Sequence, residues 1–142
     1  MREARCELWD MYNDGEWIAI TTNGFVKKNG ECVMGKGCAR EARDRFPTIA
    51  SALGTIITSG GNHVAKIAER IVSFPVKHNW WEDADIDLIK QSCDELTAYL
   101  TTNDVRRIYL PRPGCGNGKL KWNTIGCIID PLLDDRVIVV TR

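Results

Sequence analysis

The sequence has no excess of charge of either sign and no long apolar run. Nineteen lysines and arginines balance nineteen aspartates and glutamates, so no overall positive field attracts nucleic acid, although a local basic patch is still compatible with this balance. No stretch of about 18 apolar residues suits a membrane-spanning helix, and the segment from Met1 to Glu7 leads directly into polar sequence rather than a secretory signal. We therefore expect a soluble, cytoplasmic protein without a membrane partner.

The spacing that metal sites require is also missing. The two histidines, His63 and His78, are far apart in the sequence, and none of the six cysteines forms a C-x-x-C pair. Zinc sites in proteins use such short spacings, so we expect neither a metal nor a cofactor. A chain of this length does not need disulfides to hold its core. We expect mostly buried free thiols, with Cys115 as the one cysteine in a candidate site.

A glycine-rich stretch follows a strand-like segment late in the chain. Ile108 begins a β-branched and aromatic stretch, Gly114, Gly116 and Gly118 follow, and an amphipathic run extends over residues 122–133. The pattern predicts a strand, a loop and a helix, an arrangement whose backbone N–H groups suit an anion such as phosphate. The loop matches neither the P-loop nor the G-x-G-x-x-G dinucleotide pattern. A purely structural turn is the alternative interpretation.

A second unit of this kind lies upstream. The continuous apolar stretch 17–22 predicts a strand covered on both faces. A long loop with four glycines follows it, and residues 38–46 predict a helix that Pro47 ends. Two strand–loop–helix units in one chain favour a ligand-binding role for both loops over a structural one.

The whole chain is expected to form one α/β domain, residues 1–142. It is 44% hydrophobic and 27% charged, which suits an ordinary globular core. Strands that alternate with helices predict a three-layer α/β/α sandwich around a mixed, largely parallel sheet of about six strands, with both loops at strand carboxyl ends. The strand candidates are 5–11, 17–22, 63–68, 70–76, a segment that begins at Ile108, and 137–141, and the helix candidates are 38–46, 48–58, 85–101 and 122–133.

Four segments, in this order, resemble the motifs of macro domains. They are Ile20-Thr-Thr-Asn23, Val33-Met-Gly-Lys-Gly-Cys-Ala39, Phe74-Pro-Val-Lys77 and the stretch from Leu110 to Trp122. The resemblance covers nearly the whole chain. It is closest to the branch containing antitoxin macro domains that oppose DNA-ADP-ribosylating toxins, and the related single-domain hydrolases that remove ADP-ribose from acidic residues. It implies a macro-domain-like fold that binds ADP-ribose.

The resemblance also implies roles for individual residues. Glu7 takes the place of the family's adenine-reading aspartate, and Asn23 lies near the distal ribose. Lys77 is the lysine on which the DNA-directed branch relies, because Gly118 stands where other members carry an acid. Lys77 and Asn23 are thus the catalytic candidates. The ligand-binding candidates are Glu7, Leu8, Asn29, Met34, Gly35, Lys36, Gly37, Gly114, Cys115, Gly116, Asn117 and Gly118.

The residues after Lys77 leave alternatives open. Trp80 and Trp81 either stack on a base of a substrate nucleotide or cover the following helix as apolar caps. His78 is either a proton shuttle or a hydrogen-bonded loop residue. The pair Lys27-Lys28 and the two tryptophans are the side chains expected to meet whatever group carries the ADP-ribose.

The leading functional hypothesis is an ADP-ribosyl glycohydrolase that acts as a monomer. Its partner is ADP-ribose or an ADP-ribosylated substrate, either a DNA base or a protein side chain. Two other functions fit the same sequence. One is a binding module that sequesters ADP-ribose or a related nucleotide without turnover, and the other is a phosphatase acting on ADP-ribose 1″-phosphate.

Overall fold

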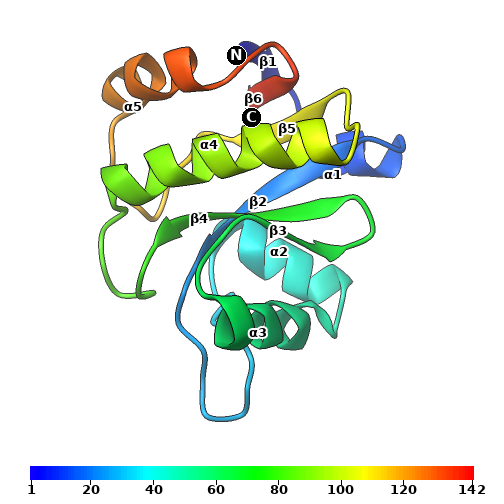
Figure 1. The fold of residues 1–142 in the computed structure, drawn as a ribbon, viewed down its shortest axis with the longest axis vertical. Coiled ribbons are helices and arrows are strands. Elements are labelled where there is room, and N and C mark those ends of the chain that lie inside the picture. Colours follow the sequence, from blue (N-terminus) through cyan, green and yellow to red (C-terminus); the bar gives the residue numbers. More distant parts are fainter.

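Six strands form one sheet in the structure, a computed structural model that describes residues 1–142, and helices lie on both faces of it (Figure 1). The strands are β1 (Arg2–Arg5), β2 (Trp17–Asn23), β3 (Ala65–Ala68), β4 (Ile71–Lys77), β5 (Ile108–Pro111) and β6 (Val137–Thr141). The helices are α1 (Leu8–Asn13), α2 (Gly37–Arg45), α3 (Ile49–Gly60), α4 (Ile86–Thr102) and α5 (Trp122–Ile129), followed by the short 3-10 helix η1 (Asp130–Leu132).

The strand order in the sheet is β1-β6-β5-β2-β4-β3. Every neighbouring pair is parallel except β3 and β4, which run antiparallel. The predicted mixed, largely parallel sheet of an α/β/α sandwich is therefore confirmed. Because β5, β2 and β4 are parallel neighbours, their carboxyl ends meet at one edge of the sheet.

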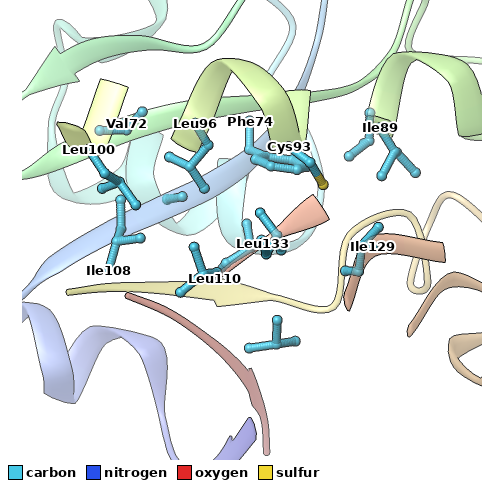
Figure 2. Close-up of a cluster of buried hydrophobic side chains, with 14 of the residues drawn as sticks. Val72, Phe74, Ile89, Cys93, Leu96, Leu100, Ile108, Leu110, Ile129 and Leu133 are labelled. Carbon is cyan, nitrogen blue, oxygen red and sulfur yellow. The ribbon is translucent and has the colours of Figure 1, made fainter. Parts of the chain in front are cut away.

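Alternate residues of each strand feed two separate cores. On β2, Ile18 and Ile20 pack with α1, α2 and α3, whereas Ala19 faces the layer of α4 and α5. Figure 2 shows the second layer, in which Cys93, Leu96 and Leu100 of α4 lie over side chains of β4 and β5. A sheet covered on both faces explains why its strands read as continuous apolar runs.

The predicted first strand, residues 5–11, is wrong. The strand β1 ends at Arg5, and Leu8 to Asn13 form helix α1. Leu8, Trp9 and Tyr12 share one helical face, and the Trp9 ring, only 2% exposed, lies 5.7 Å from the Tyr12 ring. A short apolar run fits the period of a strand as well as that of a helix. Here the burial of the Trp9 side chain favours the helix.

The other predicted elements are found with small shifts of their ends. Helix α3 ends as predicted at the Gly60-Gly61 pair, where Gly61 takes a φ of +90°. The last helix stops at Ile129, earlier than predicted, because Pro131 cannot continue it and η1 follows. None of the helices combines the length and apolar character that crossing a bilayer requires.

Candidate ligand-binding site

A cavity of about 690 Å³ opens at the carboxyl edge of the sheet. Asn23 ends β2, Lys77 ends β4 and Pro111 ends β5, and all three line it. Both predicted glycine loops line it as well, through Gly35, Lys36 and Gly37 on one side and Gly114, Gly116, Asn117 and Gly118 on the other. The fold thus brings two segments that are distant in sequence around one space, as the sequence predicted.

The first glycine loop leads directly into helix α2. Its N-cap residue is Lys36, and no side chain caps this helix start, so the first-turn N–H groups of α2 have no intrahelical partner. Gly37, at a φ of +59°, and the residues that follow it line the cavity. Helix α4 differs, because Asp85 caps its start by accepting from two backbone N–H groups. The start of α2 is left free for an anion.

The second glycine loop is held tightly at both ends and open in the middle. Leu120 N–H donates to the Gly114 carbonyl at 2.9 Å, and Ala84 N–H donates to the Gly118 carbonyl at 3.1 Å. A Cβ on Gly118 would lie 2.5 Å from the Gly114 oxygen and 2.8 Å from the Ala84 Cβ, whereas a Cβ on Gly116 would meet nothing within 4 Å. The packing therefore requires glycine at 118, and the bare backbone at Gly116 faces open space.

Lys77 joins the second loop to the end of β4. Its Nζ donates to the Asn117 carbonyl at 3.1 Å and to the Trp80 carbonyl at 3.5 Å. Burial and the nearby positive charge of Lys36 lower the pKa of the Lys77 amine, and Lys119 acts in the same direction, while Asp83 opposes them. A lysine with a lowered pKa is neutral, and therefore nucleophilic, in a larger fraction of molecules at a given pH.

Asn23 is fixed in place by bonds to its own loop. Its amide Nδ2 donates to the Val33 carbonyl at 2.9 Å, and its Oδ1 accepts from the Phe25 N–H at 2.9 Å. One N–H of the amide has no partner. Asn23 therefore shapes the loop around the cavity and retains one donor for a ligand.

A second cavity of about 440 Å³ adjoins the first. The two cavities share a border, formed by Gly37, Cys38, Pro111, Arg112 and Gly116, and together we call them the cleft. The walls of the second cavity are largely apolar beyond this junction. They include Leu8, Cys115, Leu120, Trp122 and Val140.

The remaining predicted ligand residues are divided between the cleft and its surroundings. Met34 lines the first cavity, and Leu8 and Cys115 line the second. Asn29 and Glu7 line neither. Asn29 lies at the exposed tip of the loop between β2 and α2, where its side chain bonds to Glu31.

The Glu7 carboxylate has a partner of its own. It lies beside the second cavity, at the start of α1, and accepts from Arg142 at 2.8 Å. Arg142 also bonds to Glu41, and both of these residues line the second cavity. An adenine amino group would therefore compete with Arg142 for the Glu7 carboxylate.

His78 has a structural role. Its Nε2 lies 2.8 Å from Asp85 Oδ2, a contact that lowers the pKa of the Asp85 carboxyl group. Asp85 is also the cap of α4, so the imidazole secures a helix start. This bond favours the hydrogen-bonded loop residue over the proton shuttle.

Several residues that line the cleft were not predicted from the sequence. Phe25 borders the first cavity, and Cys38 and Arg112 border both, whereas Trp80, which also borders the first cavity, was among the predicted side chains. The Arg112 guanidinium lies 4.9 Å from the centre of the Trp122 ring. The one sequence signal for Arg112 was its position between two prolines, directly after a strand and before the glycine loop. Two flanking prolines restrict the backbone there and so help to fix the position of the Arg112 side chain.

The thiols do not form a reactive or metal-binding group. All six cysteines are free, and no three histidine, cysteine or carboxylate side chains lie close enough together to hold a metal ion. Burial raises the pKa of Cys32 and of Cys93 to about 12. Burial also raises the pKa of Cys115, in the second cavity, so this thiol is a wall of the cleft rather than a nucleophile.

The curated proteins that are similar to this chain in sequence include two glycohydrolases. A DNA ADP-ribosyl glycohydrolase of Mycobacterium tuberculosis is 24% identical over 125 residues, which cover 80% of this chain and 36% of that protein. The ADP-ribose glycohydrolase OARD1 of Homo sapiens is 23% identical over 112 residues, which cover 78% of this chain and 74% of that protein. This chain therefore spans about a third of the length of the mycobacterial relative. No protein-family model matches the sequence.

The solved structures that are similar in fold include three from bacterial DarG or DarTG proteins. The macrodomain of M. tuberculosis DarG superimposes with a TM-score of 0.78 at 21% identity, over 99% of this chain and 97% of that one. The macrodomain of Thermus aquaticus DarG gives 0.73 at 25% identity, over 98% and 95%. Thermosipho africanus DarTG in complex with ADP-ribose gives 0.67 at 21% identity, over 86% and 37%. The first two similarities cover the entire six-stranded sheet and both helix layers.

Proposed function

Since this chain has the fold of a macro domain, we propose that it binds ADP-ribose and hydrolyses an ADP-ribosyl glycosidic bond. The proposal rests on the composition of one site, which combines two features. Two glycine loops close around a single cavity, and a lysine with a lowered pKa stands at its edge. The first feature suits a diphosphate, and the second suits chemistry on a sugar.

The cleft offers a place for each part of ADP-ribose. The diphosphate fits at the junction of the two cavities, where Gly37 and Gly116 expose bare backbone and Arg112 supplies a positive charge. The adenosine fits in the apolar second cavity. The distal ribose then enters the first cavity and approaches Asn23 and Lys77. Backbone N–H groups that are already in place lose little entropy on binding, which favours affinity for the diphosphate.

The reacting carbon of the bound sugar lies within reach of the Lys77 amine in this placement. In its neutral form the amine attacks the anomeric carbon, and the group that carried the ADP-ribose departs with a proton. The resulting glycosylamine opens to a Schiff base, which water hydrolyses to free ADP-ribose and the regenerated lysine. Lys36 and the burial of Lys77 support this role, because both increase the neutral fraction of the amine. A protonated Lys77 would instead donate to the departing group.

Calorimetry and a turnover assay test the two halves of the proposal separately. ADP-ribose is expected to bind in the micromolar range, about −8 kcal/mol, and AMP far more weakly because it lacks the diphosphate. The turnover substrates are a thymidine-linked ADP-ribosyl oligonucleotide and a peptide with an ADP-ribosylated acidic side chain. Binding without cleavage of either substrate would make this chain a binding module. Release of phosphate from ADP-ribose 1″-phosphate, with neither glycosidic substrate cleaved, would make it a phosphatase.

We also propose that the protein acts as a soluble monomer in the cytoplasm. Six free thiols suit a reducing compartment. The large exposed apolar side chains are Trp80 and Trp81, which lie at the cavity mouth rather than on a broad face that a second copy could cover. Light scattering coupled to gel filtration tests the monomer, and a mass twice that of the chain would contradict it.

A further inference from the structure

Three aromatic side chains form a cluster at the mouth of the first cavity. The Phe25 and Trp81 rings are 5.4 Å apart at an angle of 68°, and the Trp80 and Trp81 rings are 5.5 Å apart at 90°. We call Phe25, Trp80 and Trp81 the aromatic platform. Trp80 is 50% exposed and Trp81 is 59% exposed, and none of the three rings belongs to either core. The interpretation of the tryptophans as caps over the following helix is therefore not supported.

Hydrogen bonds brace the turn that carries the two tryptophans. The turn that carries the tryptophans is fixed on one side by the bond between His78 and Asp85. It is fixed on the other by Asn79, whose side chain donates to Glu82 Oε1 at 2.8 Å and whose carbonyl accepts from the Glu82 N–H at 3.2 Å. Aromatic rings presented in a fixed position lose little entropy when a ligand covers them. Such preorganisation is typical of a binding surface rather than of a loose loop.

Lysine side chains lie near the platform, and two of them have no carboxylate partner. Lys27 and Lys36 line the cavity beside it, and the exposed Lys28 follows Lys27. Two of the nearby carboxylates are already paired, Glu31 with Lys27 at 3.7 Å and Asp83 with Lys119 at 3.9 Å. Lys28 and Lys36 have no carboxylate within 4.0 Å. This combination of exposed rings and free lysines fits a polyanion whose units carry flat, stackable faces.

We propose that the aromatic platform stacks a base of a single-stranded nucleic acid next to the nucleotide that carries the ADP-ribose. The inference rests on the proposed function, because the platform borders the end of the cleft where the acceptor group must emerge. Single strands offer unpaired bases to aromatic rings and phosphates to lysines, whereas an acidic side chain of a protein offers only the charge. Trp80 and Phe25 line the cavity and also belong to the platform. A single strand of nucleic acid can therefore contact the platform while its ADP-ribosylated nucleotide enters the cavity.

Fluorescence anisotropy with an unmodified, labelled DNA strand of about 12 nucleotides tests the platform. We expect the wild-type protein to bind the strand, and a duplex of the same sequence more weakly because its bases are already stacked. Trp81→Ala is expected to weaken binding of the strand about tenfold, and Trp81→Phe to restore most of it. Trp17→Phe is the matched control. Trp17 begins β2, at the opposite end from the cavity, and packs against Tyr99.

A lysine pair tests the charge component in the same assay. The double variant Lys27→Ala and Lys28→Ala is expected to weaken binding of the strand at low salt and to make the dependence on salt less steep. Lys66→Ala is the control, since Lys66 lies on β3 beside Trp17 rather than beside the cavity. An equal loss of affinity for the strand in the double variant and in Lys66→Ala would show that Lys27 and Lys28 do not bind the strand, and would overturn this part of the inference.

Turnover separates the platform from the proposed function. Trp81→Ala is expected to raise KM for a thymidine-linked ADP-ribosyl oligonucleotide about tenfold and to leave KM for an ADP-ribosylated peptide unchanged. No binding of the unmodified strand, or the same change in KM on both substrates, would overturn the inference while ADP-ribose binding and cleavage still stand. Failure of the wild-type protein to bind ADP-ribose in calorimetry would instead remove the proposed function itself.

Discussion

Lys77 stands opposite Asn23 across the pair formed by β4 and β2, at the one irregularity of that pairing. Thr22 pairs with Pro75, Asn23 pairs with Lys77, and Val76 is passed over. Pro75 has no N–H to donate to the ladder, and the Val76 carbonyl accepts from Asp85 N–H at the start of α4 instead. The irregularity therefore places both catalytic candidates side by side where the strands end.

Replacing the lysine is expected to separate binding from turnover. Lys77→Ala should retain ADP-ribose affinity within about 1 kcal/mol, because the carbonyls that Lys77 contacts belong to exposed residues and can bond to water instead. Turnover should fall roughly 100-fold or more, about 3 kcal/mol in the barrier. Single-turnover rates alongside calorimetry provide the measurement, with Lys66→Ala as the control. Cleavage by Lys77→Ala at the wild-type rate would rule out the lysine mechanism.

The rate should also depend on pH in a predictable direction. Burial and Lys36 lower the pKa of Lys77, and the proposed mechanism uses the neutral amine. Turnover should therefore rise with pH and level off below the pH at which an ordinary lysine, of pKa about 10.4, would do so.

Two neighbouring charges should move the midpoint of this pH profile in opposite directions. Asp83 raises the pKa of Lys77 and Lys119 lowers it, so Asp83→Asn should move the midpoint down and Lys119→Gln should move it up. If the pH profile of turnover has the same midpoint in both variants, a group other than Lys77 controls the rate.

The glycines of the second loop should respond differently to a side chain. Gly116→Val should leave the melting temperature close to that of the wild type, because a Cβ there meets nothing within 4 Å, yet it should weaken ADP-ribose binding severely by filling the space the diphosphate needs. Gly118→Ala should instead lower the stability by about 1–3 kcal/mol through overpacking. Thermal unfolding and calorimetry on both variants check this. An unstable Gly116→Val protein, or one that binds normally, would contradict the description of the loop.

The role of Glu7 can be tested against that of its partner. If the carboxylate reads adenine, Glu7→Ala should weaken ADP-ribose binding by about 1–3 kcal/mol and leave ribose phosphate binding unchanged. Arg142→Ala should strengthen ADP-ribose binding slightly, because it frees the carboxylate that Arg142 now occupies. Competition titrations with the two ligands provide the comparison. Equal losses for both ligands in Glu7→Ala would assign Glu7 to the structure of α1 instead.

The sequence predicted the layers and both glycine loops, since these depend on local patterns. Continuous apolar strands such as β2 and glycines before a helix at 35–37 and 114–118 can be recognised without knowing what they contact. The helix α1 was missed because its six residues are too few to show a period. What favours a helix in this segment is the burial of Trp9 against Phe46, which is more than 30 residues away in the sequence.

The candidate site was predictable where the chain itself sets the geometry, and not where distant segments meet. Lys77 and Asn23 end strands, so their place at the edge followed from the order of the elements. The contact of Arg142 with Glu7 and the aromatic pair of Phe25 with Trp81 join residues more than 50 positions apart. Local sequence patterns hold no signal for contacts of this kind.

Gly118 also restricts how the site can change during evolution. Some macro domains carry an acid at the position that Gly118 occupies, but here any Cβ collides with the Gly114 oxygen and with Ala84. A single codon change to aspartate would therefore damage the loop before it could supply a new catalytic group. An ancestor or descendant that uses a carboxylate at this position must relieve both contacts: Ala84→Gly removes the one with the Ala84 methyl group, and the backbone at Gly114 must shift as well. Natural variation at positions 84 and 118 should accordingly be correlated, with the lysine at 77 retained wherever 118 is glycine.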